Sequence, residues 1–296
     1  MINFRKATLA DKGELETIIN SYSSRSVDYA FQNLVLWADY FGTEVAVLNE
    51  TLLIKYSDDC YAFPIGKHVH DAIIALMEDA KERGKQFKLS CSAGDEFEYI
   101  KCIFPEIFRF EEDRNSSEYL YDINRMCSLE GRKLHQKRNN IHRFEENYPN
   151  WSFEPITKDN IEDCRKMSKL WYAQNREFAG EDSLTHEEKA LNECLDNYEA
   201  FGMDGGLIKN GEEILAFTIG RRIGQSDALD INFEKSFNSI QGGYTIIFRE
   251  FSKYLRDKYP NLKYLNREED MGLAGLRKAK LSYQPDILLE KFIVTI

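Results

Sequence analysis

The chain has 296 residues, of which 43% are hydrophobic and 30% are charged, and it contains only six prolines and 17 glycines. This composition excludes a disordered, collagen-like or low-complexity protein, and the length predicts two domains at roughly 100 to 200 residues per domain. No apolar run approaches the roughly 18 residues that a membrane-spanning helix needs, and the first residues lack the apolar region of a signal peptide. We therefore expect a cytoplasmic protein.

Acidic residues outnumber basic residues by 50 to 39, which gives a net charge of −11. Residues 1–124 carry 13 basic and 22 acidic side chains, residues 125–147 carry six and three, and residues 148–296 carry 20 and 25. A chain that is acidic in both halves is a poor general binder of nucleic acids, although a local basic patch can meet one phosphate-rich ligand. The segment 125–147 is the candidate for such a patch.

The cysteines and histidines show no metal-binding pattern. The six cysteines are Cys60, Cys91, Cys102, Cys127, Cys164 and Cys194. They form no C-x-x-C pair and have no nearby histidine at the spacing of metal ligands, and the five histidines are also dispersed. We predict buried free thiols and no structural metal.

The first unit, residues 1–124, alternates short β-like runs with amphipathic helical segments. We expect strands at residues 2–5, 43–48, 51–56, 60–64, 87–91, 108–112 and 118–123. Helices are expected from about residue 9, over residues 68–83 and near residues 93–102. Gly84 follows the second of these helices at the position where a helix C-cap is common.

A basic connecting helix is expected within residues 125–149. Its apolar stripe consists of Leu134, Ile141, Phe144 and Tyr148, and Pro149 ends it. Lys133 and Lys137 lie four residues apart on a neighbouring face, and Arg138 lies beside them. Two interpretations stay open: a solvated connecting helix, or a helix whose cations face an anionic ligand between two domains.

The second unit, residues 150–296, follows the order strand, two helices, antiparallel strands, helix, strand, helix, strand. We expect strands at residues 152–156, 206–209, 213–222, 228–233, 263–266 and 287–294, and helices at 161–174, 185–198, 244–258 and around 273–280. This order resembles the GNAT acyltransferase fold, and the first unit can be read in the same way. The expected fold class is therefore α+β with mixed sheets, in which two tandem GNAT-like acyl-CoA N-acyltransferase folds are joined by the basic helix.

A glycine-containing turn between a strand and a helix is the strongest local signal for a ligand site. It consists of Gln241, Gly242, Gly243, Tyr244 and Thr245. A helix N-terminus presents unpaired N–H groups, and glycine lets a phosphate approach the backbone closely. The turn resembles the GNAT pyrophosphate loop, but its glycines are adjacent and Ser239 stands where that loop has Arg or Gln. A plain Gly-Gly turn is the alternative interpretation.

A second match to the GNAT pattern lies at residues 276–285. Lys280 and Tyr283 fall on the Lys and Phe of the GNAT segment, whereas Lys278 occupies the position that often holds a general-acid Tyr. Lys278 can donate a proton at neutral pH only if burial or a cationic neighbour such as Arg277 lowers its pKa. The alternative is that these residues are solvent-facing cations.

Charged residues directly follow two expected strands of the second unit. Arg267, Glu268 and Glu269 follow one strand, and Glu234 and Lys235 end another. Strand ends are where α/β sheets present reactive side chains, so a carboxylate here can accept a proton from an amine. Solvated loops are the alternative interpretation for both segments.

Four separated segments, residues 28–37, 131–139, 233–235 and 266–280, together resemble a bacterial family of unknown function that is grouped with the C-terminal domain of phosphatidylglycerol lysyltransferases. The resemblance spans nearly the whole chain. It implies two acyltransferase-like domains with the working cleft in the second domain and at the junction. Lipid lysyltransferases take an aminoacyl group from tRNA and carry membrane-spanning helices, which this sequence lacks, so we expect a soluble acceptor.

Our first hypothesis is an acyl- or aminoacyltransferase that moves an activated acyl group from an acyl-CoA or an aminoacyl-tRNA to an amine or hydroxyl of a small molecule or peptide. No tightly bound cofactor is expected. The predicted catalytic residues are Glu234, Lys235, Arg267, Glu268, Glu269 and Lys278. Donor phosphates are assigned to Gln241, Gly242, Gly243, Tyr244 and Thr245, and substrate contacts to Lys133, Lys137, Arg138, Arg277, Lys280 and Tyr283. The second hypothesis is a non-catalytic binding or regulatory protein that kept the fold and lost the donor site.

Overall fold

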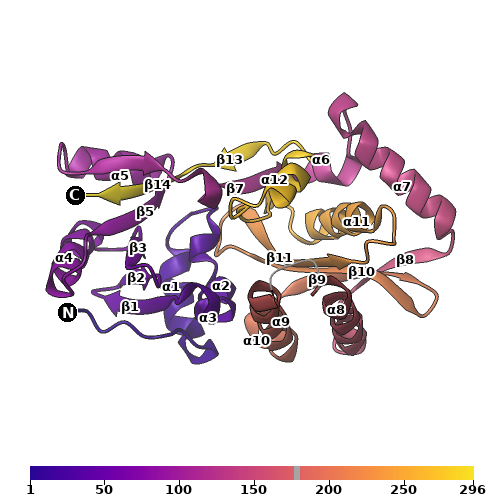
Figure 1. The fold of residues 1–296 in the computed structure, drawn as a ribbon, viewed down its shortest axis with the longest axis horizontal. Coiled ribbons are helices and arrows are strands. Elements are labelled where there is room, and N and C mark those ends of the chain that lie inside the picture. The colour runs from indigo at the N-terminus through magenta and orange to yellow at the C-terminus, as the bar shows by residue number, and fades with distance from the viewer. Residues whose placement is uncertain (177–180) are drawn as a thin grey trace.

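The computed structural model describes residues 1–176 and 181–296. Within these residues the chain forms two seven-stranded mixed sheets, one toward each end of the long axis of the molecule (Figure 1). No helix of the described part combines the length and apolar character needed to cross a membrane. The two mixed sheets with their helices confirm the predicted α+β class.

The first sheet is built mainly from the N-terminal part of the chain. Its strands are β1 (Glu44–Leu48), β2 (Thr51–Lys55), β3 (Cys60–Ala62), β4 (Ile65–Gly66), β5 (Lys88–Ser92), β6 (Arg109–Glu112) and β14 (Lys291–Thr295). They run in the order β1-β2-β3-β5-β14-β6, with β4 paired to β2. The accompanying helices are α1 (Lys12–Asn20), α2 (Phe31–Leu36), α3 (Ala38–Phe41), α4 (Val69–Glu82) and α5 (Asp95–Ile103).

The second sheet has helices on both faces. Its strands are β7 (Glu118–Asp122), β8 (Trp151–Pro155), β9 (Asp204–Asn210), β10 (Glu213–Arg222), β11 (Ala228–Ser236), β12 (Tyr264–Asn266) and β13 (Ile287–Leu289), in the order β13-β7-β12-β11-β10-β9-β8. The helices are α6 (Ile123–Ser128), α7 (His135–Asn147), α8 (Ile161–Asn175), α9 (Glu181–Asp196), α10 (Tyr198–Phe201), α11 (Gly243–Lys258) and α12 (Ala274–Leu281). Helix α11 covers one face, and α8 to α10 lie on the other (Figure 1).

The two sheets exchange strands. Strand β7 precedes residue 124 but pairs with β12 and β13 of the second sheet, and β14 near the C-terminus pairs with β5 and β6 of the first. The expected single strand at residues 287–294 is therefore wrong, because the chain passes from one sheet to the other at Glu290. The expected strand at residues 2–5 is also wrong, since it is reduced to one bridge between Arg5 and Val45. The domain division at residues 124 and 150 stays a prediction.

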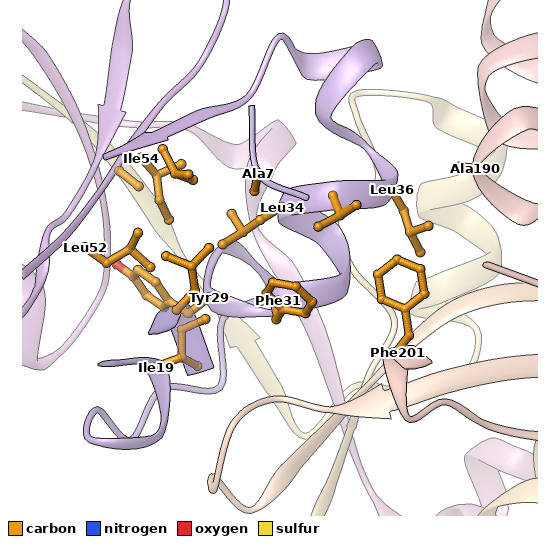
Figure 2. Packing of buried hydrophobic residues seen from close by; sticks show 14 of the residues in the cluster. Ala7, Ile19, Tyr29, Phe31, Leu34, Leu36, Leu52, Ile54, Ala190 and Phe201 are labelled. Atoms are coloured by element: carbon orange, nitrogen blue, oxygen red, sulfur yellow. The ribbon is translucent and has the colours of Figure 1, made fainter. Parts of the chain in front are cut away.

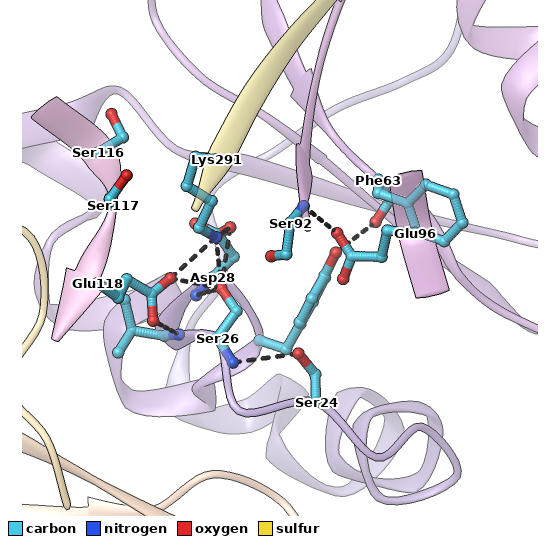
Figure 3. A network of polar contacts seen from close by, with 12 residues as sticks. Ser24, Ser26, Asp28, Phe63, Ser92, Glu96, Ser116, Ser117, Glu118 and Lys291 are labelled. Atoms are coloured by element: carbon cyan, nitrogen blue, oxygen red, sulfur yellow. Dashed lines mark hydrogen bonds and ion pairs between the residues drawn. The ribbon is translucent and has the colours of Figure 1, made fainter. Parts of the chain in front are cut away.

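A buried ion network holds the exchanged strands together. Lys291 of β14 contacts Glu118 of β7 at 2.8 Å and donates to the Ser26 hydroxyl at 2.6 Å (Figure 3). It also pairs with Asp28. The two carboxylates raise the pKa of Lys291 against the opposing effect of burial, so the lysine is charged inside the protein.

The apolar core continues across the junction between the units. Tyr29, Phe31 and Leu34 pack toward the first sheet, and the same cluster includes Ala190 of α9 and Phe201 of α10 (Figure 2). The rings of Phe31 and Phe201 have their centroids 6.3 Å apart. Since apolar burial is the main favourable term in folding, this continuous cluster fixes the two units against each other.

The connecting helix lies where its apolar stripe predicts. Leu134, Ile141 and Phe144 are buried, and α7 runs from His135 to Asn147 after a short 3-10 turn over Arg132–Leu134. The cysteines are free thiols, and all are buried except Cys102, which is exposed. The expectation of burial is therefore wrong for Cys102, which lies near the end of α5 with its side chain exposed to solvent.

Candidate functional site

The second sheet opens where β11 and β12 diverge. The strands pair in parallel only over residues 228–230 and 264–266, while β11 continues to Ser236. The register between β10 and β11 shifts there, because Phe233 pairs with Ile219 and Ile231 pairs with the adjacent Gly220. Such bulges re-aim side chains and are frequent beside active sites. We call the diverging strand ends and the side chains that join them the fork site.

Glu234 and Arg267 bridge the two arms of the fork site. The Arg267 Nη2 atom lies 2.7 Å from Glu234 Oε1, and the Glu234 side chain is 7% exposed. The second carboxylate oxygen, Oε2, has no hydrogen-bond partner among the described residues. Burial raises the pKa of Glu234, and the guanidinium of Arg267 opposes that shift.

Aromatic rings hold the cations of the fork site. The guanidinium carbon of Arg267 lies 4.6 Å from the ring centroid of Phe248 on α11 and 5.1 Å from that of Tyr283. Lys137 of α7 places its ammonium 3.6 Å from the Tyr283 centroid. Cations over aromatic faces are stabilised by the ring quadrupole, so both positive groups are held in place.

Lys137 of the fork site has a lowered pKa. Burial and the nearby charge of Arg267 together lower the pKa of Lys137 to about 8, while Glu234 opposes the shift. The Tyr283 hydroxyl lies 3.4 Å from the hydroxyl of Thr245, near the start of α11. Five residues that were predicted from separate segments therefore converge here: Lys137, Glu234, Thr245, Arg267 and Tyr283.

Glu268, Glu269 and Lys280 form a second charged group next to the fork site. Lys280 donates to the backbone carbonyl oxygens of Arg267 and Glu269 and so fixes the loop after β12. Burial raises the pKa of Glu268 and of Glu269, and for Glu268 the charge of Asp230 adds to the effect. The solvated-loop interpretation is therefore wrong for this segment, because its carboxylates lie in a low-dielectric environment.

The polar residues of β11 that the sequence analysis missed are Asp230 and Asn232. Asp230 is fully buried and accepts from Asn33 at 2.9 Å and from Asn232 at 2.8 Å. Burial raises the pKa of Asp230 to about 8. Gln32 also donates to this carboxylate, at 3.2 Å. The available signal was two polar residues within an otherwise apolar strand.

Several predicted site residues lie away from the fork site. Lys235 faces the opposite side of the sheet, where its ammonium lies 2.6 Å from Glu187 and 3.9 Å from the Trp171 ring centroid. Arg277 pairs with Asp270 at 2.7 Å. Arg138 donates to backbone carbonyls of residues 129 and 131. Lys133, Lys278 and Gln241 are exposed.

The glycines of the turn before α11 are explained by close packing. A Cβ on Gly242 would lie 2.3 Å from the carbonyl oxygen of Asn140 on α7, and one on Gly243 would lie 2.0 Å from Ser236 Oγ. Gly242 also has a φ of 84°, a conformation that favours glycine. Tyr244 joins the wall of this region by accepting a hydrogen bond from the Trp171 indole at 3.2 Å. The assignment of donor phosphates to residues 241–245 stays a prediction.

The arrangement of the second sheet, with its parallel β11–β12 pair opening at the start of α11, defines a GNAT-like fold, and the structural neighbours below share it. The chain belongs to the family described as phosphatidylglycerol lysyltransferase, C-terminal, whose model matches residues 20–295. Both the predicted family and the predicted fold are thereby confirmed. The family and the fold place the chain in the GNAT-like class of transferases.

Solved structures are similar over nearly the whole chain. A conserved protein of unknown function from Bacteroides thetaiotaomicron is 34% identical, with a TM-score of 0.89 and coverage of 100% of both chains. L-PGS from Bacillus licheniformis is 15% identical, with a TM-score of 0.65 over 96% of this chain and 91% of that one. The C-terminal domain of a lysylphosphatidylglycerol synthetase from Agrobacterium fabrum is 13% identical, with a TM-score of 0.67 over 97% and 92%.

A curated relative from Mycoplasmoides gallisepticum, described as an uncharacterised protein, is 23% identical over 208 residues. The match covers 69% of this chain and 63% of the relative. The chain therefore spans less than two thirds of that relative's length.

Proposed function

We propose that this protein is an aminoacyltransferase that takes an aminoacyl group from charged tRNA and passes it to an amine or hydroxyl acceptor at the fork site. The observation that carries the proposal is the Glu234 carboxylate, which is buried, anchored through one oxygen by Arg267 and free at the other. A carboxylate of raised pKa next to fixed cations is an arrangement suited to general acid–base chemistry.

Glu234, Arg267 and Lys137 can carry out each proton and charge transfer of the proposed reaction. The acceptor oxygen or nitrogen attacks the ester carbonyl, and its proton passes to Glu234 Oε2. Negative charge that develops on the carbonyl oxygen is neutralised by Arg267. The ester bond to the ribose then breaks, and Lys137 gives a proton to the departing ribose oxygen. Proton return from Glu234 to Lys137, directly or through water, restores both groups.

Three features favour an aminoacyl ester over an acyl-CoA as the donor. The family is one of lysyltransferases. The backbone of Asn140 occupies the space beside Gly242 that a pyrophosphate would need to reach the glycine turn. Three cations are exposed on α7 and on the turn before it: Arg132, Lys133 and Arg143. Helix α7 also carries Lys137 into the fork site. Exposed cations beside the site can guide the phosphates of a tRNA acceptor end.

Thermal unfolding with candidate donors tests this proposal. Coenzyme A, acetyl-coenzyme A, deacylated tRNA and a mixed aminoacyl-tRNA pool are added in turn to the wild-type chain and to the Lys133→Glu/Arg143→Glu variant. A ligand at about 100 times its Kd adds about 2.7 kcal/mol of stability, which shifts Tm by several degrees. We expect the largest shift with aminoacyl-tRNA, reduced in the variant and by added salt. A shift with acetyl-coenzyme A alone identifies a conventional acyltransferase, and no shift with any donor favours a non-catalytic binding protein.

A further inference from the structure

A cavity of about 800 Å³ lies apart from the fork site, at the junction of the two units. One wall consists of residues 22–25 and 92–96, and the other includes the β10–β11 turn and the loop before β12. Residues of the predicted site line no part of it. The cavity lies beside the N-terminal end of β11, whereas Glu234 lies near the C-terminal end of the same strand.

The first wall presents buried acceptor groups. Glu96 is 4% exposed; its carboxylate accepts from the Ser92 backbone N–H at 2.7 Å and from the Tyr22 hydroxyl at 3.2 Å. The Ser92 hydroxyl is also buried, at 4% exposure of the residue, and has no hydrogen-bond partner among the described residues. Figure 3 shows this hydroxyl turned away from the Glu96 carboxylate. A buried polar group without a partner is costly, so a ligand that completes it gains binding energy.

The floor near this wall is open. Gly94 has a φ of 93°, and a Cβ placed on it would meet no atom within 4 Å. Asp95, the first residue of α5, is exposed and lines the same cavity. The first wall therefore carries the carboxyl groups of Asp95 and Glu96 beside free space. Burial raises the pKa of Glu96 to about 7, and a cationic group bound beside it favours the charged carboxylate.

The opposite wall is cationic. Arg222 and Lys263 line it together with Asp227, and Arg25 of the first wall reaches across to Asp227. Asp227 is already neutralised, because Arg25 donates to both of its carboxylate oxygens, at 2.7 and 2.9 Å. Lys263 is farther from Asp227, at 3.5 Å, and its side chain is 67% exposed. Lys263 and Arg222 thus offer positive charge to an acidic group.

We propose that this cavity binds a small zwitterion, with its ammonium at Ser92 and Glu96 and its acidic group toward Arg222 and Lys263. The two oppositely charged walls select a molecule that carries both charges over one that carries either alone. This site is separate from the donor and acceptor chemistry proposed for Glu234.

Calorimetric binding and thermal unfolding of the full chain with the twenty proteinogenic amino acids and glycylglycine test the proposal. At least one zwitterion is expected to bind, while its N-acetyl and methyl ester derivatives bind at least about tenfold more weakly, because each lacks one charge-assisted contact. Failure of every zwitterion to bind overturns the proposal, as does equal binding of the blocked derivatives.

Variants locate the binding. Ser92→Ala and Glu96→Gln are each expected to weaken zwitterion binding about tenfold, and Lys263→Met is expected to weaken it less. Glu98→Gln, on the exposed face of the same helix, is the matched control and leaves binding unchanged. Ser92→Ala removes an unpartnered hydroxyl, so a purely structural role predicts unchanged or increased stability and unchanged binding. Unchanged zwitterion binding in both Ser92→Ala and Glu96→Gln overturns the proposed site. Glu234→Gln is expected to retain zwitterion binding, and this result separates the cavity from the transferase proposal.

Discussion

Glu234 and Arg267 stand beyond the short parallel pairing of β11 and β12, and their side chains join the two strands across 2.7 Å. The pairing leaves one carboxylate oxygen without a hydrogen-bond partner in the part of the chain that the structure describes, and it holds a guanidinium against Phe248 and Tyr283. A fixed ion pair with one free acceptor is a positioned base rather than a saturated salt bridge. The predictions below follow from this arrangement and from the buried charges around it.

The alkaline limit of activity is predicted to depend on Lys137. Its folded pKa is lowered to about 8, so the ammonium that protonates the leaving group is lost as pH rises through that value. Lys137→Arg keeps the positive charge but cannot release the proton, so kcat is expected to fall by about 10²–10⁴-fold across the whole pH range. Lys133→Arg, one turn away and exposed, is the control and leaves the profile unchanged. A Lys137→Arg variant that keeps the wild-type kcat and an alkaline limit near pH 8 rules out this role.

Asp230 is predicted to make the fold less stable as pH rises. Burial raises its folded pKa to about 8 from the ordinary value of 3.8, so between these pH values the folded state holds a proton that the unfolded state has lost. The stabilisation is present below the unfolded pKa and declines between the two values, by up to about 1.4 kcal/mol per pH unit. Asp230→Asn removes this part of the pH dependence. Urea unfolding at pH 5, 7 and 9 measures the free energy of unfolding, and Asp257→Asn serves as an exposed control. If the free energy of unfolding changes with pH equally in the wild type and in Asp230→Asn, the assignment is contradicted.

Two glycines of the second unit are predicted to respond oppositely to alanine. Gly243→Ala places a Cβ 2.0 Å from Ser236 Oγ and is expected to cost about 1–3 kcal/mol. Gly275→Ala in α12 meets no atom within 4 Å and is expected to stabilise by about 0.5–1 kcal/mol, because alanine restricts the unfolded chain. Denaturant unfolding compares them. If a Gly243 variant loses donor binding, its stability must be measured as well, because the loss can come from the packing defect. An unchanged free energy of unfolding in Gly243→Ala would show that the close packing is absent.

Removal of Lys291 is predicted to weaken the connection between the exchanged strands. Lys291→Met leaves the buried Glu118 and the half-buried Asp28 without their cation, and breaking a buried ion pair typically costs about 3–5 kcal/mol. Lys158→Met, at an exposed position, is expected to stay within about 0.5 kcal/mol of the wild type. Equilibrium unfolding in guanidinium chloride measures both. A loss below about 1 kcal/mol for Lys291→Met would show that the network is not needed to hold β14.

Local patterns predicted most elements but not their partners. The apolar stripe of α7 and the strand at β7 were readable because helical and strand periodicities are local properties. The pairing of β7 with β12 and β13 joins residues more than 140 positions apart, and no local pattern records which sheet a strand enters. The passage of the chain from β13 to β14 was not predicted for the same reason.

The fork site was predicted in composition and only partly in geometry. Glu234 and Arg267 were found because charged residues at strand ends are frequent in functional sites. Lys235 was placed with them although it contacts Glu187 on the other face, as expected for neighbouring residues of a strand, whose side chains alternate between the two faces. Asp230 was missed because Asp230 and Asn232, which alternate with apolar residues in β11, match no known motif. Its Gln32 and Asn33 partners lie about 200 positions away.

Loss of labelled amino acid from charged tRNA tests the central claim most directly. The rate is measured with wild-type protein and a heat-treated whole-cell extract as the source of acceptor, and then with Glu234→Gln and the exposed control Glu213→Gln. We predict that the wild type and Glu213→Gln transfer the label to an acceptor, and that Glu234→Gln is slower by about 10²–10⁴-fold with an unchanged fold. Transfer at the wild-type rate by Glu234→Gln, or no transfer by the wild type above the protein-free rate, would contradict the account.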